Sequence, residues 1–183
     1  MKALELINIG SNKLKMNSIK SFILDSEILL SKVLNKKREE VLVDLNQKID
    51  NNKILEFLKY IDRRASKEPI AYIIQRKEFW SKNFEVNNKT LIPRPETELM
   101  LEKLIYIYKK KSINILDVGT GSGCIILSLL CELKSSKGIG IDISPGALQI
   151  AKKNAKKLNM LGNIEFRKKS LNSFFSQKFD LIV

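Results

Sequence analysis

Three glycines follow a short apolar stretch in ILDVGTGSGCIILSLL, residues 115–130, at a G-x-G-x-G spacing: Gly119, Gly121 and Gly123. Glycine tolerates positive φ angles and has no side chain, so such a run lets the backbone turn sharply and approach a ligand closely. The apolar residues before the run predict a strand, and those after it predict a helix whose N-terminus faces that ligand. The run therefore predicts a ligand-binding turn.

The residues around the run limit which cofactor it could hold. Cys124 stands where the G-x-G-x-x-G fingerprint of nicotinamide and flavin binding has glycine or alanine, which disfavours a dinucleotide. No Gly-Lys-Ser/Thr follows, so a phosphate-binding P-loop is excluded. A tight strand-to-helix turn without any ligand would also use glycines, so the run alone leaves the question open.

Two aspartates near this turn carry more information. Asp142 ends the next predicted strand, 19 residues beyond Gly123, where a carboxylate can accept hydrogen bonds from both hydroxyls of a ribose. Asp117 precedes the run, and its negative charge would repel a pyrophosphate but attract an amino group or a sulfonium. Together with the glycine spacing, the two carboxylates favour S-adenosylmethionine as the cofactor.

The composition excludes several other kinds of chemistry. The 183-residue chain contains no histidine, which excludes imidazole bases, serine–histidine nucleophile pairs and histidine-ligated metals, and we predict no metal site. Cys124 and Cys131 lie in one predicted helix with their backbones about 10 Å apart, too far for a disulfide. We expect both to be buried thiols.

Length, hydropathy and targeting signals indicate a globular protein of one or two domains. Hydrophobic residues make up 44% of the chain, yet no apolar run approaches the roughly 18 residues of a membrane-spanning helix. The N-terminus lacks the apolar core of a secretory signal. We therefore expect a cytoplasmic protein that does not bind membranes, and a monomer.

The net charge of +13 is compatible with a nucleic-acid partner, but the lysines have a simpler explanation. The apolar positions Leu148, Ala151, Ala155 and Leu158 follow helical spacing and leave the lysines between them on the solvated face. No aromatic residues alternate with the lysine clusters, as a single-strand-binding site would require. We predict no dedicated nucleic-acid site.

The first two regions of the chain differ in their periodicity. Residues 1–70 predict a helical bundle that ends at Pro69, with two apolar stripes: Ile54, Leu58, Ile61 and Ala65, and Leu24, Ile28 and Val33. Residues 71–95 contain the β-prone pieces AYII, EFW and FEV with the turn residues Asn87 and Asn88, and predict a β-hairpin linker.

From residue 96 onward, predicted strands alternate with predicted helices: INILDV, CIILSLLCEL, GIGID, PGALQIAKKNAKKL, NIEF and FDLIV. This alternation is typical of an α/β fold with a parallel sheet and right-handed crossovers. The glycine run and Asp142 then meet at the carboxyl edge of the sheet, because each follows or ends a strand.

The string EPIAYIIQRKEFWSKNFEVNNKTLIPRPETELM, residues 68–100, is more specific than these patterns. Its Pro69, the pairs Tyr72-Ile73 and Phe79-Trp80, and the run from Leu91 to Glu98 closely resemble the HemK/PrmC family. Members of this family are methyltransferases that modify the glutamine of the Gly-Gly-Gln motif in class-1 peptide chain release factors. The resemblance covers nearly all of the chain.

The resemblance implies an architecture and a partner. It implies a class I S-adenosylmethionine-dependent methyltransferase fold, Rossmann-like, over residues 96–183, with a β-hairpin linker over residues 71–95. The helical bundle over residues 1–70 would dock a class-1 release factor. The strands present would form a partial sheet in the spatial order 3-2-1-4.

The resemblance also assigns site residues. Those around the methionine portion of S-adenosylmethionine would be Gly119, Thr120, Gly121, Ser122 and Gly123, with Asp142 on the ribose. Beside the adenine the family has an aspartate and a bulky apolar residue, where this sequence has Ser170 and Leu171. Serine is a weaker, uncharged acceptor, so we expect lowered affinity for the cofactor.

The PRPETE run permits two interpretations. From physics alone, its prolines stiffen a turn and Glu96 or Thr97 starts a helix with carboxylates in the first turn. The resemblance implies that the run also closes over the methionine end of the cofactor. Arg94, Glu96, Thr97 and Glu98 would then line the rim of the active site.

The last residues depart from the family. There, the strand that FDLIV matches leads into Asn-Pro-Pro-Tyr, which holds the amide nitrogen of the target glutamine, and this motif is not in the sequence. We therefore expect no catalytic residue within the 183 residues and a truncated or split member that binds the cofactor weakly. Methyl transfer to a release factor by the purified chain would contradict that expectation.

Two other functions stay open at this point. One is a non-catalytic cofactor- or protein-binding fragment. The other is a nucleic-acid adenine methyltransferase, because such enzymes share the Asn-Pro-Pro-Tyr chemistry.

Overall fold

The computed structural model describes residues 1–170 and 177–183. The chain divides into two compact units, Met1–Ile74 and Gln75–Val183, and each is described by itself. No helix among the described residues is long and apolar enough to cross a membrane.

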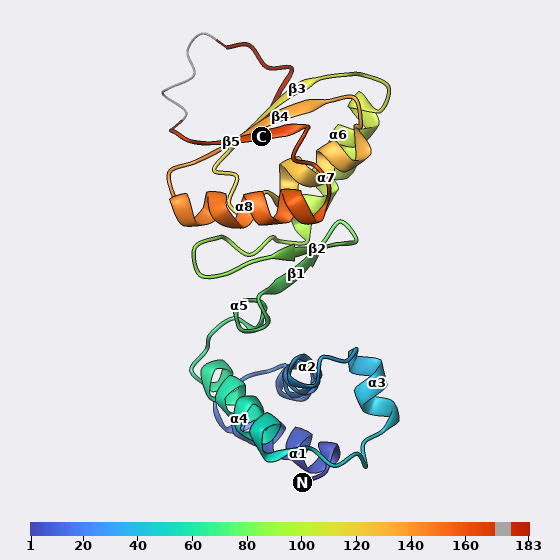
Figure 1. Ribbon diagram of the computed structural model, residues 1–183, viewed down its shortest axis with the longest axis vertical. Coiled ribbons are helices and arrows are strands. Elements are labelled where there is room, and N and C mark those ends of the chain that lie inside the picture. The colour runs from blue at the N-terminus through green and yellow to red at the C-terminus, as the bar shows by residue number, and fades with distance from the viewer. Residues whose placement is uncertain (171–176) are drawn as a thin grey trace. The chain divides into compact units, whose positions relative to one another are not determined.

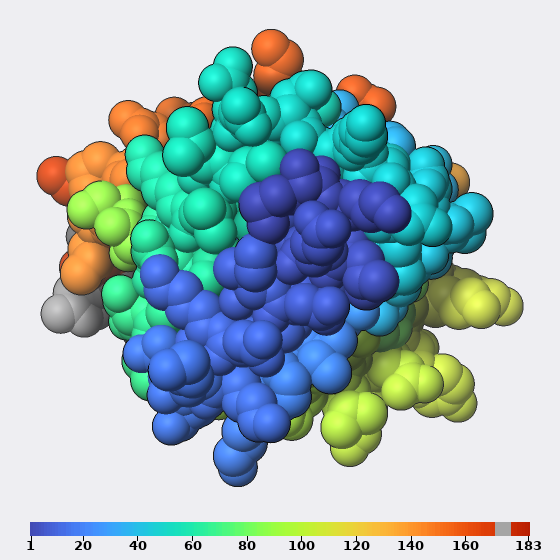
Figure 2. Space-filling view, turned by 90° about the horizontal axis from the view of Figure 1, so that it is seen from below, coloured from blue at the N-terminus to red at the C-terminus, as the bar shows by residue number. Residues whose placement is uncertain are grey.

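The first unit consists of five helices: α1 (Ala3–Met16), α2 (Phe22–Leu34), α3 (Arg38–Val43), α4 (Asn51–Ala65) and α5 (Ile70–Ile74). Helices α1 and α2 approach closely at Gly10, where an added Cβ would lie 2.5 Å from the Ser26 hydroxyl oxygen. That hydroxyl donates a hydrogen bond of 3.0 Å to the Ile7 carbonyl. Helices α1 and α4 also contact one another, and the space-filling view shows them in deep blue and teal (Figure 2).

The predicted helices of this unit are confirmed. The predicted apolar stripe of α4 is correct, and that of α2 is correct only in part. On α4, Ile61 is fully buried, and so is Phe57, which the predicted stripe omitted. On α2, Val33 is buried as predicted, but Leu24 is exposed, and Leu29 and Leu30, which the stripe omitted, are completely buried. The buried face of α2 is therefore centred on Leu29 and Leu30 rather than on Leu24, because α1 packs against that side.

The segment AYII was expected to be β-prone and instead lies in α5. The amides of Tyr72 and Ile73 both donate to the Pro69 carbonyl, at 3.0 and 3.3 Å. Proline is pre-organised for the start of a helix, so Pro69 precedes a helical turn rather than simply ending the bundle. Packing of α5 on α2 and α4 overrides the strand propensity of its isoleucines.

The second unit begins with a hairpin of β1 (Arg76–Phe79) and β2 (Lys82–Glu85), paired antiparallel from Arg76 with Glu85 to Phe79 with Lys82. Its turn residues Trp80 and Ser81 both have positive φ, 50° and 52°, as a two-residue type I′ turn requires. The predicted hairpin is confirmed, but its turn is not at Asn87 and Asn88. Those residues lie after β2, where the Thr90 amide donates to the Asn87 carbonyl at 3.0 Å.

The rest of the second unit alternates strands and helices: α6 (Glu96–Tyr108), β3 (Asn114–Val118), α7 (Cys124–Glu132), β4 (Lys137–Asp142), α8 (Pro145–Lys157), β5 (Ile164–Lys168) and β6 (Leu181–Ile182). The four strands from β3 onward form one parallel sheet in the order β5-β4-β3-β6. This is the predicted order 3-2-1-4 of the Rossmann-like fold.

Helices α7 and α8 cover one face of this sheet (Figure 1). Gly138 in β4 makes the close packing possible, because an added Cβ would lie 2.6 Å from the Cδ1 atom of Ile126 in α7. Helix α8 begins at Pro145, and the hydroxyl of Ser144 before it accepts a hydrogen bond of 3.2 Å from the Ala147 amide. The lysines of α8 are exposed and Ala151 and Ala155 are fully buried, as predicted.

Candidate functional site

The glycine run forms the turn between β3 and α7 at the carboxyl edge of the sheet. Its three glycines all have positive φ: 73° at Gly119, 55° at Gly121 and 77° at Gly123. The amides of Gly119 and Thr120 both donate to the Ile141 carbonyl of β4, each at 2.9 Å. The turn is thereby fixed to the neighbouring strand, in a backbone conformation that strongly favours glycine.

The first two glycines leave the outer surface of the turn open. A Cβ added to Gly119 would meet no atom within 4 Å, and one added to Gly121 would meet only the Gly119 carbonyl oxygen, at 3.8 Å. Gly123 faces inward, since a Cβ there would lie 3.0 Å from Leu127 and 3.4 Å from Ala151. The turn therefore packs on α7 and α8 through Gly123 and exposes backbone at Gly119.

Asp142 connects this turn with the one that follows β4. One carboxylate oxygen accepts a hydrogen bond of 3.0 Å from the Gly121 amide, and the other accepts one of 2.8 Å from the Ser144 amide. The side chain is half-buried. Each carboxylate oxygen has a further lone pair, so Asp142 can still accept hydrogen bonds from a diol.

Asp117 contributes a buried carboxyl group directly beneath the turn. It is 3% exposed and accepts a hydrogen bond of 2.7 Å from the Thr120 hydroxyl. Burial raises the pKa of Asp117 to about 6; the hydrogen bonds from the Thr120 hydroxyl and the Ile126 amide oppose the rise, and the charge of Asp142 adds to it. At pH 7 the turn thus has a mostly ionised carboxylate below it.

Gly140 provides the space that this arrangement needs. A Cβ at Gly140 would lie 3.0 Å from the Thr120 hydroxyl oxygen and 2.8 Å from the ring of Phe166. Glycine in β4 therefore lets Thr120 reach Asp117 while Phe166 of β5 packs beside it. The sequence reasoning selected Thr120 but gave no role to Gly140.

The four candidate rim residues lie at the start of α6 and just before it. Arg94 and Glu96 are exposed, while Thr97 and Glu98 are half-buried. The Glu98 carboxylate accepts a hydrogen bond of 2.8 Å from the Trp80 amide in the hairpin turn. Glu98 therefore links the first turn of α6 to the hairpin turn through this hydrogen bond.

The two residues expected beside the adenine are only partly described. Ser170 is exposed and lies two positions beyond Lys168, the last residue of β5, past the carboxyl end of the sheet. Leu171 lies outside the described residues. Because Asp142 is paired in register with Lys168, Ser170 follows the strand next to the Asp142 carboxylate.

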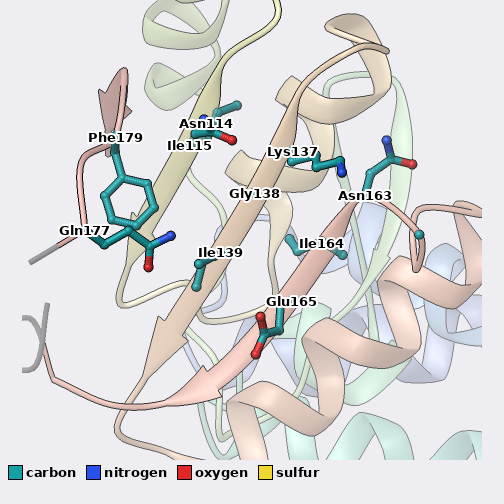
Figure 3. Close-up of a pocket in the computed structure, with 11 residues that line it drawn as sticks. Asn114, Ile115, Lys137, Gly138, Ile139, Asn163, Ile164, Glu165, Gln177 and Phe179 are labelled. Carbon is teal, nitrogen blue, oxygen red and sulfur yellow. The ribbon is translucent and has the colours of Figure 1, made fainter.

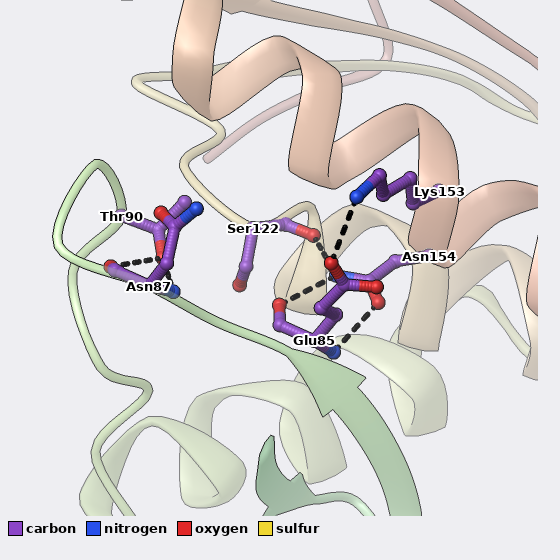
Figure 4. Close-up of polar contacts among 6 residues, drawn as sticks. All are labelled: Glu85, Asn87, Thr90, Ser122, Lys153 and Asn154. Carbon is purple, nitrogen blue, oxygen red and sulfur yellow. Dashed lines mark hydrogen bonds and ion pairs between the residues drawn. The ribbon is translucent and has the colours of Figure 1, made fainter. Parts of the chain in front are cut away.

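Sequence reasoning missed Asn154 of α8, which is 1% exposed. Its side-chain amide donates to the Ser122 carbonyl in the glycine turn at 2.9 Å. It also bonds both the amide and the carbonyl of Glu85 in the hairpin (Figure 4). A signal was available, because Asn154 occupies a position of the buried stripe of α8 where an apolar residue is the rule.

The described part of the chain also contains a cavity of about 300 Å³ at the opposite edge of the sheet. Asn114, Lys137 and Asn163 line it, at or beside the amino ends of β3, β4 and β5 (Figure 3). Gln177 and Phe179 line it as well. Parallel strands place ligands at their carboxyl ends, so we assign the candidate site to the glycine turn and not to this cavity.

Known protein families match both parts of the chain. The family described as the PrmC N-terminal domain matches residues 5–74, and a methyltransferase domain family matches residues 109–183.

Curated relatives match across both parts. The release factor glutamine methyltransferase of Buchnera aphidicola subsp. Baizongia pistaciae is 42% identical over 184 residues, covering 100% of this chain and 66% of that protein. The same-named protein of Buchnera aphidicola subsp. Schizaphis graminum is 46% identical over 161 residues, covering 87% of this chain and 58% of its own length. The bifunctional methyltransferase of Rickettsia typhi is 39% identical over 199 residues, covering 98% of this chain and 38% of that protein.

The chain therefore spans between 38% and 66% of the length of these three relatives. Among solved structures, the ribosomal protein L11 methylase of Lactobacillus delbrueckii subsp. bulgaricus matches with a TM-score of 0.44 and 29% identity, covering 53% of this chain and 49% of that one.

Proposed function

Because this chain belongs to the HemK/PrmC family of methyltransferases, we propose that it holds S-adenosylmethionine at the glycine turn. The observation that carries the proposal is the position of Asp142, whose carboxylate bridges the Gly121 and Ser144 amides at the carboxyl edge of the sheet. A carboxylate held in this way is suited to receive ribose hydroxyls. The match of residues 109–183 to a methyltransferase domain family supports the same cofactor.

The described residues fit the cofactor in shape and charge. Gly119 leaves the turn open on its outer side, so a ligand can approach the backbone closely. Asp117 places a buried negative charge below the turn, which favours a ligand that carries an ammonium and a sulfonium group. The cofactor, when bound, supplies an electrophilic methyl group.

We propose further that the acceptor is the side-chain amide of the glutamine in the Gly-Gly-Gln motif of class-1 release factors. An amide nitrogen is a poor nucleophile because its lone pair is delocalised, so the protein's task is to orient that lone pair and exclude water. None of the 183 residues is a histidine, so these residues contribute to the reaction through carboxylates, hydroxyls and backbone groups. Arg94 and the first turn of α6, with Glu96, Thr97 and Glu98, remain the proposed rim of the site.

The first unit, residues 1–74, is the proposed docking surface for the release factor. Support comes from its match to the PrmC N-terminal domain over residues 5–74. A nucleic-acid adenine methyltransferase has no comparable support, and the lysines of α8 point to solvent as a charged helix face commonly does.

A binding competition tests the substrate class. The 183-residue chain is titrated with a fluorescently labelled class-1 release factor at increasing salt, with S-adenosylhomocysteine present. We expect saturable binding that persists at physiological salt and is not displaced by duplex DNA or structured RNA, since a nucleic-acid contact would weaken steeply with salt. Displacement by nucleic acid, with no saturable binding of the release factor, would overturn the proposed substrate.

A further inference from the structure

Asn154 is a polar side chain in the buried stripe of an otherwise amphipathic helix. It lies in α8 next to the fully buried Ala155 and is itself 1% exposed. A buried amide without hydrogen-bond partners would cost about 1 to 3 kcal/mol, so its contacts matter to the fold. Asn154 has three of them, and they reach two segments far away in the sequence.

The first segment is the end of the hairpin strand β2. The Glu85 amide donates to the Asn154 Oδ1 atom at 2.7 Å, and the Asn154 Nδ2 atom donates back to the Glu85 carbonyl at 3.0 Å. The side-chain amide thus pairs with Glu85 on both sides, as a neighbouring strand would. A second, exposed contact joins the same elements, because the Lys153 ammonium lies 3.1 Å from the Glu85 carboxylate.

The second segment is the glycine turn. The Asn154 Nδ2 atom donates its other hydrogen to the Ser122 carbonyl at 2.9 Å. Ser122 lies between Gly121 and Gly123. The Gly121 amide donates a hydrogen bond to the Asp142 carboxylate, and Gly123 packs on Leu127. Both hydrogens of the Asn154 amide are used, one on the hairpin and one on the proposed cofactor turn (Figure 4).

We infer that Asn154 is a positioning residue that couples the proposed cofactor turn to the β1–β2 hairpin, so that binding of the cofactor orders the end of β2. The inference rests on the proposed function, because it takes the glycine turn as the cofactor site. The chain continues from the hairpin through the Asn87–Thr90 turn to the proposed rim residues Arg94, Glu96, Thr97 and Glu98. Asn154 therefore connects the cofactor turn with the segment that leads to the rim.

Hydrogen exchange on the wild-type chain tests the coupling without any substitution. The Glu85 amide is the direct reporter, since its acceptor is the Asn154 side chain. We expect S-adenosylhomocysteine to slow its exchange by roughly tenfold, as restricting a coupled opening would do. The amide of Lys77 on the partner strand serves as an internal reference for the hairpin as a whole.

Three variants separate positioning from stability. Asn154→Ala removes all three bonds, and Lys153→Ala removes only the exposed ion pair. Leu148→Ala removes a buried apolar side chain of α8 and none of these hydrogen bonds. Affinity for S-adenosylhomocysteine is measured by titration calorimetry and thermal stability by near-UV circular dichroism. We expect Asn154→Ala to bind roughly tenfold more weakly, with the ligand effect on Glu85 abolished, while both controls keep the wild-type affinity.

The outcomes distinguish this inference from the function on which it rests. If the wild type fails to bind S-adenosylhomocysteine, the proposed function is wrong and the inference falls with it. If the wild type binds but the Glu85 amide exchanges equally fast with and without ligand, only the coupling is refuted. The same holds if Asn154→Ala is no weaker a binder than Leu148→Ala of equal stability.

Discussion

Asp25 of the first unit and Asp117 of the second are buried to the same extent, 3% exposed, but their surroundings differ. The Asp25 carboxylate lies 2.7 Å from the Arg64 guanidinium and accepts a bond of 2.9 Å from the Ser21 hydroxyl. Asp117 has a hydroxyl and a backbone amide as partners, and the charge that acts on its pKa is that of another carboxylate, Asp142, which raises it. Asp25 is therefore paired with a cation inside the helical unit, whereas no cation among the described residues forms an ion pair with Asp117.

This difference separates a structural carboxylate from a functional one. A buried charge that is paired inside the chain depends on its partner, because removing that partner leaves an uncompensated charge and is strongly destabilising. A buried charge held without a cation, at the open edge of a parallel sheet, costs stability that a cationic ligand can recover. The predictions below test whether the two aspartates behave in these opposite ways.

The largest effect is expected from breaking the pair in the first unit. Arg64→Ala leaves the Asp25 carboxylate buried without a cation, and we expect the free energy of unfolding of that unit to fall by about 3 to 5 kcal/mol. Urea denaturation followed by far-UV circular dichroism measures it. Lys13→Ala is the matched control, since the Lys13–Asp62 pair is exposed and its loss should cost less than about 1 kcal/mol. Equal losses in the two variants would refute the structural role of Asp25.

Asp117→Asn should have the opposite sign for stability. The pKa of Asp117 is raised from 3.8 to about 6, so ionisation at pH 7 opposes folding, and removing the charge should stabilise the second unit by about 1 to 3 kcal/mol. The same change should weaken binding of S-adenosylmethionine. The single tryptophan, Trp80, lies in the second unit and reports its unfolding by fluorescence. A variant that is less stable and binds equally well would contradict this account of Asp117.

The pH dependence of the wild type follows from the same shift. The native state holds the Asp117 proton more tightly than the unfolded chain does, so this group lowers the stability of the second unit as the pH rises from about 4 to 6. Binding of a cationic ligand has the reverse dependence, because it requires the ionised form. We expect affinity for S-adenosylmethionine to fall by up to about tenfold per pH unit below pH 6, and Asp117→Asn to lose this slope. Calorimetric titrations between pH 5 and 7.5 measure both.

The smallest effect is expected at the hairpin. Glu98→Gln replaces the charged acceptor of the Trp80 amide by a neutral one, which should destabilise the turn by about 0.5 to 1.5 kcal/mol. Faster hydrogen exchange of the Trp80 amide would show the change. The same substitution can also be made in a full-length relative, where methyl transfer is measured. Loss of methyl transfer there, with unchanged exchange of the Trp80 amide here, would show that Glu98 acts at the rim and not through the hairpin.

The elements that carry the site could be predicted because their signals are local. The strand ending at Val118, the glycine run and the helix starting at Cys124 are adjacent in the sequence. The strand order came from the family resemblance, and the observed order β5-β4-β3-β6 agrees with it. Asp142 followed from its spacing alone. The resemblance of residues 68–100 supplied the family, which no periodicity could have done.

The features that could not be predicted depend on contacts distant in the sequence. Asn154 reaches Glu85, 69 residues away, and Glu98 reaches Trp80, 18 residues away, and neither pairing leaves a repeating pattern. The buried face of α2 was partly misplaced because the apolar residues of FILDSEILL surround the helix, and the side that is buried depends on the packing of α1, α3, α4 and α5. The raised pKa of Asp117 likewise arises from burial, which a single sequence does not report.

The central claim is that Asp142 and the glycine turn form the site of S-adenosylmethionine. Isothermal titration of this ligand into the wild-type chain and into Asp142→Ala tests it most directly. The account predicts one binding site per chain in the wild type and at least about tenfold weaker binding in the variant, with the variant still folded by near-UV circular dichroism. No binding to the wild type, or equal affinity in the two proteins, would contradict it.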